Sequence, residues 1–200
     1  MTIAATFAGI ALDRPRIMAI VNVTPDSFSD GGDRLDPAQA IDDGLRFASE
    51  GADIVDVGGE STRPGSRSVD PNDELKRVLP VVEGLAKRGL VVSVDTRRAL
   101  VARACLEAGA RIVNDISAGL DDPAMLPLLA ETAAPVILMH RAGRPETNYV
   151  VPPYGDVVGE VRRFLVGRAE ACIAAGVKRD AIAFDPGAGF GKSVEENLAL

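Results

Sequence analysis

The sequence contains no tryptophan, a single histidine and only two cysteines among its 200 residues. Cys105 and Cys172 each fall in an alanine-rich, helical-looking stretch, which predicts small buried thiols rather than a disulfide framework. No apolar run approaches the ~20 residues that a membrane helix needs, and the first residues lack the basic start and apolar stretch of a signal peptide. We therefore expect a cytoplasmic protein that makes no contact with a membrane.

Positive charge is also scarce, because 22 Lys and Arg stand against 29 Asp and Glu for a net charge of −7. Broad binding to nucleic acid or to an anionic membrane needs basic patches, and no run of Lys and Arg of that kind appears. The composition excludes nucleic acid as an expected partner. An anionic small-molecule substrate would have to be met by a few placed cations or by a metal.

The single histidine, His140, lies in an apolar run, where a structural, hydrogen-bonded role is the favoured interpretation. No GxSxG motif accompanies it to indicate a Ser-His-Asp hydrolase, and no cluster of His and Cys indicates zinc. The chain thus lacks the signals of the commonest nucleophilic and zinc-dependent enzymes.

Short apolar runs rich in β-branched residues alternate with helical patterns along the whole chain. Near-continuous apolar strands suit a parallel sheet that is covered on both faces, and strand followed by helix six times predicts an α/β fold. The predicted strands are Arg16–Val23, Ala52–Gly58, Leu90–Asp95, Arg111–Asp115, Pro135–His140 and Ala181–Asp185.

Nearly every predicted strand finishes in a polar side chain: Asn22, Asp56, Asp95, Asn114, Asp115, His140 and Asp185. A ring of polar groups at the carboxyl ends of strands is how a (β/α)8 barrel builds its active site, and that fold takes about 250 residues. Residues 1–200 are therefore predicted to form one barrel domain that is truncated after the sixth βα unit, with strands seven and eight missing.

Two loops at these strand ends carry unusual sequences. Loop 1, residues 22–32 (NVTPDSFSDGG), is long and polar and displays Phe28, which favours a functional lid over a plain surface loop. Loop 2, residues 58–66 (GGESTRPGS), carries Arg63, whose guanidinium suits a phosphate or carboxylate. We interpret Glu60 in the same loop as a carboxylate that braces the loop rather than as a catalyst.

Asp95, Asn114 and Asp185 end three different strands, so their side chains are predicted to converge at one mouth. Two carboxylates and an amide could hold a heterocycle with several N–H donors, such as the amino-pyrimidinone edge of a pterin. The alternative is that they are helix caps and salt bridges at the barrel mouth. The turn at 185–193 (DPGAGFGKS) is not a P-loop, because Pro186 occupies the position of its first glycine.

Six segments together identify a family. IVNVTPDSFSDGG, DIVDVGGESTRPGS, VSVDT, VNDISAG, LMHRAG and DPGAGFGKS occur in the order and at the spacing found in dihydropteroate synthases, so that the chain resembles this family from Arg16 to its last residue. The resemblance implies a (β/α)8 barrel and a transferase of folate biosynthesis. Such an enzyme joins 6-hydroxymethyl-7,8-dihydropterin diphosphate to p-aminobenzoate, releases pyrophosphate and is a target of sulfonamides.

The resemblance also implies roles for individual residues. Catalytic roles fall to Arg63, Asp95, Asn114 and Asp185, and the pterin pocket adds Met139. Asn22 matches the position near Mg²⁺ and the departing pyrophosphate, which makes Mg²⁺ the expected cofactor. The p-aminobenzoate side and its mobile loops match the following residues: Ser27, Phe28, Thr62, Arg63, Pro64 and Phe190.

The chain departs from the family by lacking a Ser-Arg-Lys-like motif and an Arg-x-His pair that follow in its members. We therefore expect these 200 residues alone to be inactive and poorly stable, and the whole protein to form a homodimer. Two alternatives remain open. One is a methyltetrahydrofolate-dependent corrinoid methyltransferase, and the other is a dihydropteroate synthase paralogue that binds without catalysis.

Overall fold

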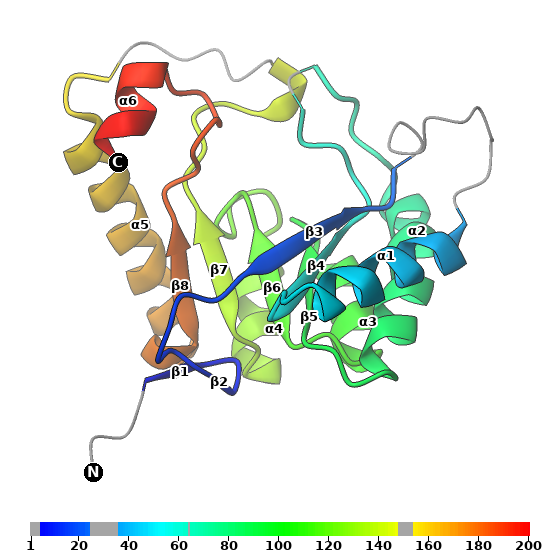
Figure 1. Cartoon of the computed structure of the whole chain (residues 1–200). Helices are drawn as coiled ribbons and strands as arrows, with labels where there is room; N and C mark the ends of the chain where they lie inside the picture. Colours follow the sequence, from blue (N-terminus) through cyan, green and yellow to red (C-terminus); the bar gives the residue numbers. More distant parts are fainter. Residues whose placement is uncertain (1–4, 25–35, 64, 148–153) are drawn as a thin grey trace.

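The computed structural model describes residues 5–24, 36–63, 65–147 and 154–200. Six parallel strands form one sheet in which the order in space follows the order in sequence (Figure 1). Sequential parallel strands separated by helices are the repeating unit of a (β/α)8 barrel, and all six predicted strands are confirmed. They are β3 (Met18–Asn22), β4 (Ile54–Gly58), β5 (Val92–Asp95), β6 (Ile112–Asp115), β7 (Val136–Met139) and β8 (Ile182–Asp185).

Helices follow the strands (Figure 1). The α-helices are α1 (Pro37–Ser49), α2 (Pro71–Ala86), α3 (Ala99–Glu107), α4 (Met125–Thr132), α5 (Val157–Ala174) and α6 (Val194–Ala199). Of these, α1 to α5 cover the outside of the sheet, whereas α6 lies beside α5 near the carboxyl ends of the strands (Figure 1). The short 3₁₀ helices η2 (Pro145–Thr147) and η3 (Arg179–Ala181) lie in the loops on either side of α5. In these described ranges no helix is both long and apolar enough to cross a bilayer.

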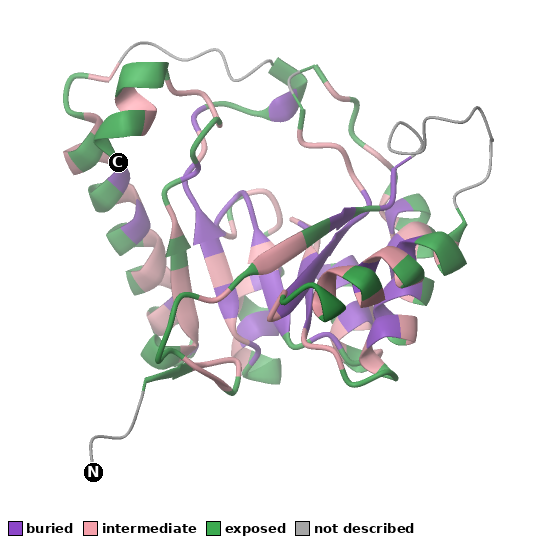
Figure 2. Ribbon diagram, in the orientation of Figure 1, coloured by how far each residue is buried: buried purple, intermediate pink, exposed green. Residues whose placement is uncertain are grey.

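Alternation along each strand separates a core face from an inner face. Val55, Val57 and Val94 are buried on the outer face, where they share one apolar cluster with Val82 and Leu85 of α2 (Figure 2). The residues between them point to the opposite side, into the concave inner face of the sheet. This division leaves the inner face available for polar side chains.

Capping side chains begin several helices as the sequence predicts. Asp36 and Asp70 accept hydrogen bonds from backbone N–H groups of the first turns of α1 and α2, and Ser193 forms a capping box at α6. α3 begins after Arg98, whose side chain does not cap it. The hydroxyl of Thr96 donates to buried Glu74 and accepts from the N–H of Arg98, which precedes the helix. The N–H of Ala99 is satisfied from a neighbouring loop instead.

The first two strands of the chain were not predicted. A two-stranded antiparallel hairpin, β1 (Thr6–Phe7) with β2 (Ile10–Ala11), precedes the first barrel strand. It lies near the amino ends of the parallel strands, at the end opposite the polar residues (Figure 1). Strands of two residues are too short to show the alternation on which a sequence-based prediction depends.

Candidate active site

The strand register places several predicted site residues in a single row. Asn22 pairs with Gly58, Gly58 pairs with Asp95, and Asp95 pairs with Asn114 across four neighbouring strands. Residues in one row of a parallel sheet project to the same face. Three polar side chains and one glycine therefore line a continuous stretch of the inner face at the carboxyl ends of the strands.

Gly58 keeps a space open in this row. A Cβ built there would lie 3.4 Å from Asp95 Oδ2 and 3.5 Å from Asn22 Oδ1, so the two oxygens border the same space. Mg²⁺ prefers oxygen ligands and is often held by one or two protein groups together with substrate phosphates. Within the described residues no group of three His, Cys, Asp or Glu forms a metal cluster. The Oδ1 atom of Asn22 borders this space and is an oxygen donor of the kind that could hold such an ion.

Asp56 lies one layer below the row and supports it. It occurs two residues before Gly58 on the same face, and its register partner is Ser93. The side-chain nitrogen of Asn114, Nδ2, donates to Asp56 Oδ2 at 2.9 Å. The carboxamide oxygen of Asn114 is thereby turned away from Asp56. Asp56 was not predicted as a site residue, although its two-residue spacing from Gly58 could have indicated that it shares the inner face.

The pKa values of Asp56 and Asp95 are both raised above the ordinary value of an aspartate. Burial raises the pKa of Asp56, and burial together with the nearby charges of Asp56 and Glu74 raises the pKa of Asp95 well above its usual value. A buried carboxylate is destabilised by desolvation and by like charges and is stabilised by N–H donors. The inner face is thus suited to a ligand that brings N–H groups or positive charge.

Asp185 and Met139 are register partners one layer above the row. Met139 lies two residues beyond Ile137, which pairs with Asn114, so Met139, Asp185 and Asn114 all project to the inner face. Met139 is buried, and Asp185 Oδ1 accepts a hydrogen bond of 2.7 Å from the N–H of Gly187. The structure therefore brings Asp95, Asn114 and Asp185 to one side of the sheet, with Met139 as an apolar neighbour.

The glycine-rich turn after β8 is fixed from inside by Lys192. Its ammonium donates to the carbonyl oxygens of Gly187 at 2.7 Å, Phe190 at 3.3 Å and His140 at 3.3 Å. Burial lowers the pKa of Lys192 to about 8. This lysine thus stabilises the turn that carries the half-buried Phe190.

His140 lies behind the site in an apolar setting. Its ring packs edge-on against Phe164 with centroids 4.9 Å apart. Burial lowers its pKa to about 4, so the imidazole is neutral at physiological pH. The packing agrees with the structural role that the sequence favoured, but the expected hydrogen bond is missing at Nδ1, which is buried without a partner among the described residues.

Loop 2 stands over the row with Thr62 half-buried and Arg63 exposed. The N–H of Gly65 donates to the carbonyl oxygen of Pro145 at 2.8 Å, which ties the loop to the segment after β7. Exposure leaves the Arg63 guanidinium accessible to an incoming anion. Three predicted site residues, Ser27, Phe28 and Pro64, lie outside the residues that the structure describes.

Comparisons with known proteins show which family the chain resembles. The pterin-binding enzyme family matches residues 18–200. The dihydropteroate synthase of Mycobacterium leprae is 52% identical over 186 residues, which is 92% of this chain and 66% of that protein. The Escherichia coli enzyme of the same name is 44% identical over 201 residues, which is 100% of this chain and 71% of that protein.

Solved structures give the same result. Dihydropteroate synthase from Xanthomonas albilineans with 4-aminobenzoic acid is 49% identical with a TM-score of 0.89, over 96% of this chain and 69% of that one. The same enzyme in complex with 7,8-dihydropteroate has a TM-score of 0.83 and 45% identity, over 94% of this chain and 66% of that one. The chain thus spans about two thirds of the length of the relatives it matches. On these matches of sequence and fold, the chain belongs to the dihydropteroate synthase family of pterin-binding enzymes.

Proposed function

We propose that the protein condenses 6-hydroxymethyl-7,8-dihydropterin diphosphate with p-aminobenzoate to give 7,8-dihydropteroate and pyrophosphate. The observation that carries the proposal is the row Asn22, Asp95 and Asn114 on one face, with Asp185 on the same face. The relatives from Xanthomonas albilineans that hold 4-aminobenzoic acid and 7,8-dihydropteroate, a substrate and the product of this reaction, support it.

Recognition of the pterin follows from the acceptors in the row. The amino-pyrimidinone edge presents several N–H donors, and the carboxylates of Asp95 and Asp185 together with the Asn114 oxygen can accept them. A site whose buried acceptors are paired only by the correct ligand rejects analogues that lack the N–H groups. Met139 would contact the flat face of the ring.

The difficult step is the breakage of the carbon–oxygen bond that releases the diphosphate. The aryl amine of p-aminobenzoate is already a neutral nucleophile, so no strong base is needed. As the bond breaks, positive charge develops on the pterin methylene, and the acidic inner face stabilises it electrostatically. When bound, Mg²⁺ would neutralise charge on the leaving diphosphate, and Asn22 would help to hold it.

The other side of the site would hold the amine. Thr62 and Arg63 in loop 2 and Phe190 after β8 are the residues proposed to shape the p-aminobenzoate pocket, with Ser27, Phe28 and Pro64. Loops over the site orient the amine towards the methylene and exclude water, which would otherwise capture the cationic intermediate. A cytoplasmic location and a homodimer are further parts of this proposal, supported by the family resemblance.

A pyrophosphate-release assay on the natural gene product tests the proposal. Release should require both substrates and Mg²⁺, and a sulfonamide should compete with p-aminobenzoate, as the drug complex of the Yersinia pestis enzyme suggests. Asp185→Asn should reduce turnover at least about a hundredfold while leaving the thermal midpoint nearly unchanged. Methyl transfer from methyltetrahydrofolate, or pterin binding without any turnover, would overturn it.

A further inference from the structure

We propose that Arg97 is a positioning residue that joins loop 2 to the β7 loop, defined as residues 140–147, so that the two loops form one wall over the p-aminobenzoate side. The inference rests on the proposed function for the identity of that side. The joining of the loops itself stands on contacts within the chain.

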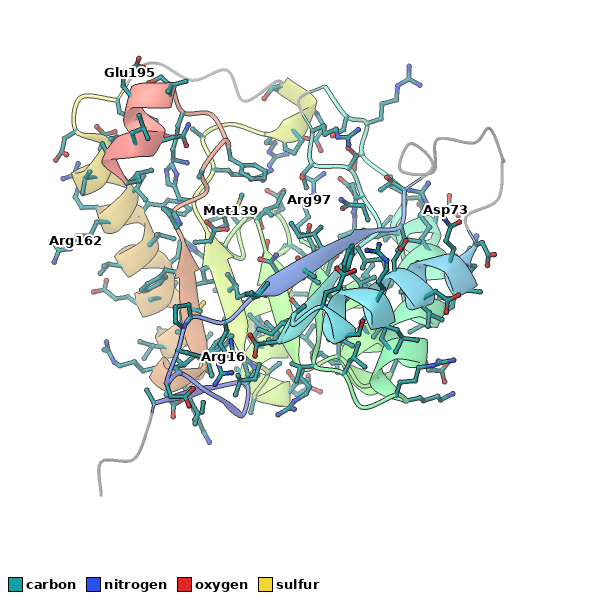
Figure 3. The ribbon with its side chains drawn as sticks, viewed as in Figure 1. Arg16, Asp73, Arg97, Met139, Arg162 and Glu195 are labelled. Carbon is teal, nitrogen blue, oxygen red and sulfur yellow. The ribbon has the colours of Figure 1, made fainter. Side chains whose placement is uncertain are left out.

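Arg97 lies directly after β5 with its side chain only 11% exposed. Its guanidinium forms ion pairs with Glu60 of loop 2 and with Glu146 of the β7 loop. A third bond of 2.7 Å reaches Asp121 Oδ2 in the segment before α4. Guanidinium carries several N–H donors in one fixed plane, so it can hold carboxylates from three loops at once. Figure 3 shows Arg97 at the carboxyl end of the strands, near the level of Met139.

A backbone contact links the same two loops independently. The N–H of Gly65 in loop 2 donates to the carbonyl oxygen of Pro145 at 2.8 Å, and Pro145 is buried. Figure 1 shows the two segments meeting above the strand ends. Loop 2 is therefore attached to the β7 loop at two points, one through Arg97 and one through the main chain.

Neighbouring charges extend the network. Arg98 pairs with Glu60 and with buried Glu74, and Arg141 pairs with Asp121 at 2.6 Å. If Arg97 is lost, Glu60 stays paired with Arg98. Asp121 likewise stays paired with Arg141, but Glu146 of the β7 loop loses its ion pair. Because the pair is partly buried, its loss is more costly than the loss of a surface pair. The network is thus a rigid support rather than a set of exposed ion pairs.

The network borders directly on the site. Arg97 and Glu60 line one small cavity together with Thr62 and Asp95. Asp95 is fixed by its strand, whereas Thr62 belongs to a loop whose position depends on Glu60. Loss of Arg97 should therefore disturb the loop side of the site and spare the strand side.

Hydrogen exchange measures the joining of the loops without any assay of activity. Arg97→Met should accelerate exchange about tenfold in both 59–66 and 140–147 while the barrel strands keep their protection. Glu146→Gln should accelerate exchange in loop 2 although the change lies in the other loop. Arg103→Met is the matched control, because Arg103 pairs with Glu131 on the exposed surface, and it should change neither loop.

Two outcomes would overturn the inference. The first is that Glu146→Gln leaves hydrogen exchange in loop 2 unchanged. The second is that Arg97→Met accelerates exchange in one of the two loops alone. Arg97→Lys retains the charge but not the planar array of N–H donors. Both loops should therefore exchange more slowly in Arg97→Lys than in Arg97→Met, but faster than in the unchanged protein. Should Arg97→Met fail to fold, Glu146→Gln and Arg97→Lys still decide the matter.

Kinetics on the natural gene product then separate positioning from general damage. Arg97→Met should raise the KM for p-aminobenzoate about tenfold while the Kd for 6-hydroxymethylpterin, measured by calorimetry, stays within about twofold of the unchanged protein. The positioning role would be refuted if Arg97→Met weakened the binding of both ligands equally, or if it weakened the binding of neither. A wild-type protein with no turnover would instead refute the proposed function, and the exchange result would stand.

Discussion

The side-chain nitrogen of Asn114 donates to Asp56 Oδ2 at 2.9 Å, which connects two layers of the inner barrel face. A carboxylate can only accept a hydrogen bond, so Asp56 selects which end of the amide it meets. The carboxamide oxygen of Asn114 then points towards the open carboxyl end of the barrel, where it can accept a hydrogen bond from a pterin N–H. Asp56 thus orients a residue of the site without itself lying in the row.

Asp56→Val tests this orientation, because valine removes the acceptor and suits a buried strand. An Asn114 amide left unpaired costs about 1–3 kcal/mol, and the amide is free to turn its nitrogen outwards. We therefore expect the affinity for 6-hydroxymethylpterin to fall at least about tenfold by calorimetry.

Two matched variants control that experiment. Asp56→Asn still offers an oxygen to Asn114 and should lose much less affinity. Ser93→Ala alters the register partner of Asp56 without touching the bond and should also bind nearly normally. Tight pterin binding by Asp56→Val would show that Asn114 does not depend on Asp56.

Gly187→Ala probes the turn that carries Phe190. A Cβ at Gly187 would lie 1.9 Å from the carbonyl oxygen of His140, and its φ is +70°. Left-handed backbone alone costs a non-glycine residue about 1–2 kcal/mol, and here the clash is with main chain that cannot rotate away. We expect a loss of more than about 2 kcal/mol in the free energy of unfolding, measured with urea.

Gly189 provides the control for this change. Its φ is +83°, but no atom lies within 4 Å of the Cβ position. Gly189→Ala should therefore show the conformational cost without the clash. Equal losses for the two variants would mean that contact with His140 contributes nothing.

Much of the architecture could be predicted from the sequence, for local reasons. Apolar runs with β-branched residues located the six parallel strands, and the polar residues near their carboxyl ends identified the end that carries the site. The predictions of Asp95, Asn114 and Asp185 needed only the rule that carboxyl ends of parallel strands meet at one edge.

Features that depend on distant pairs were not predictable in this way. The register that aligns Asn22 with Gly58, and the bond from Asn114 to Asp56, exist only once the strands are paired. Arg97 joins carboxylates that are 37 and 49 positions away in sequence, and no local pattern indicates such a contact. The bond from Thr96 to Glu74 of α2 is another contact of this kind.

Asp53 should contribute to stability in a pH-dependent way. It accepts 2.9 Å bonds from the N–H of Ile17 and from Arg16, and Arg14 also pairs with it. The Ile17 bond first, then the two guanidinium groups, lower the pKa of Asp53 from 3.8 to about 2. A lowered folded pKa gives stability that is present above the unfolded pKa and is lost as pH falls towards the folded one.

The stabilising effect of Asp53 is therefore expected to disappear between pH 3.8 and about 2. Asp53→Asn should lower stability at pH 7 and make the urea midpoint fall less steeply across that interval. Asp42→Asn, on an exposed position of α1, is the control and should follow the unchanged protein. If the urea midpoint of Asp53→Asn fell as steeply with pH as that of the unchanged protein, Asp53 would not be the source of this pH dependence.

The two thiols should be inert in the folded protein. Cys105 and Cys172 are fully buried, and burial raises the pKa of Cys105 to about 12 and raises that of Cys172 as well. Only the thiolate attacks iodoacetamide, and at pH 8 a thiol of that pKa is ionised in about one molecule in ten thousand. Mass spectrometry should detect no alkylation at pH 8 in the native protein and modification of both residues in concentrated guanidinium chloride. Rapid native labelling of Cys105 would mean that α3 opens readily from the sheet, since its thiol cannot be reached while the helix stays packed.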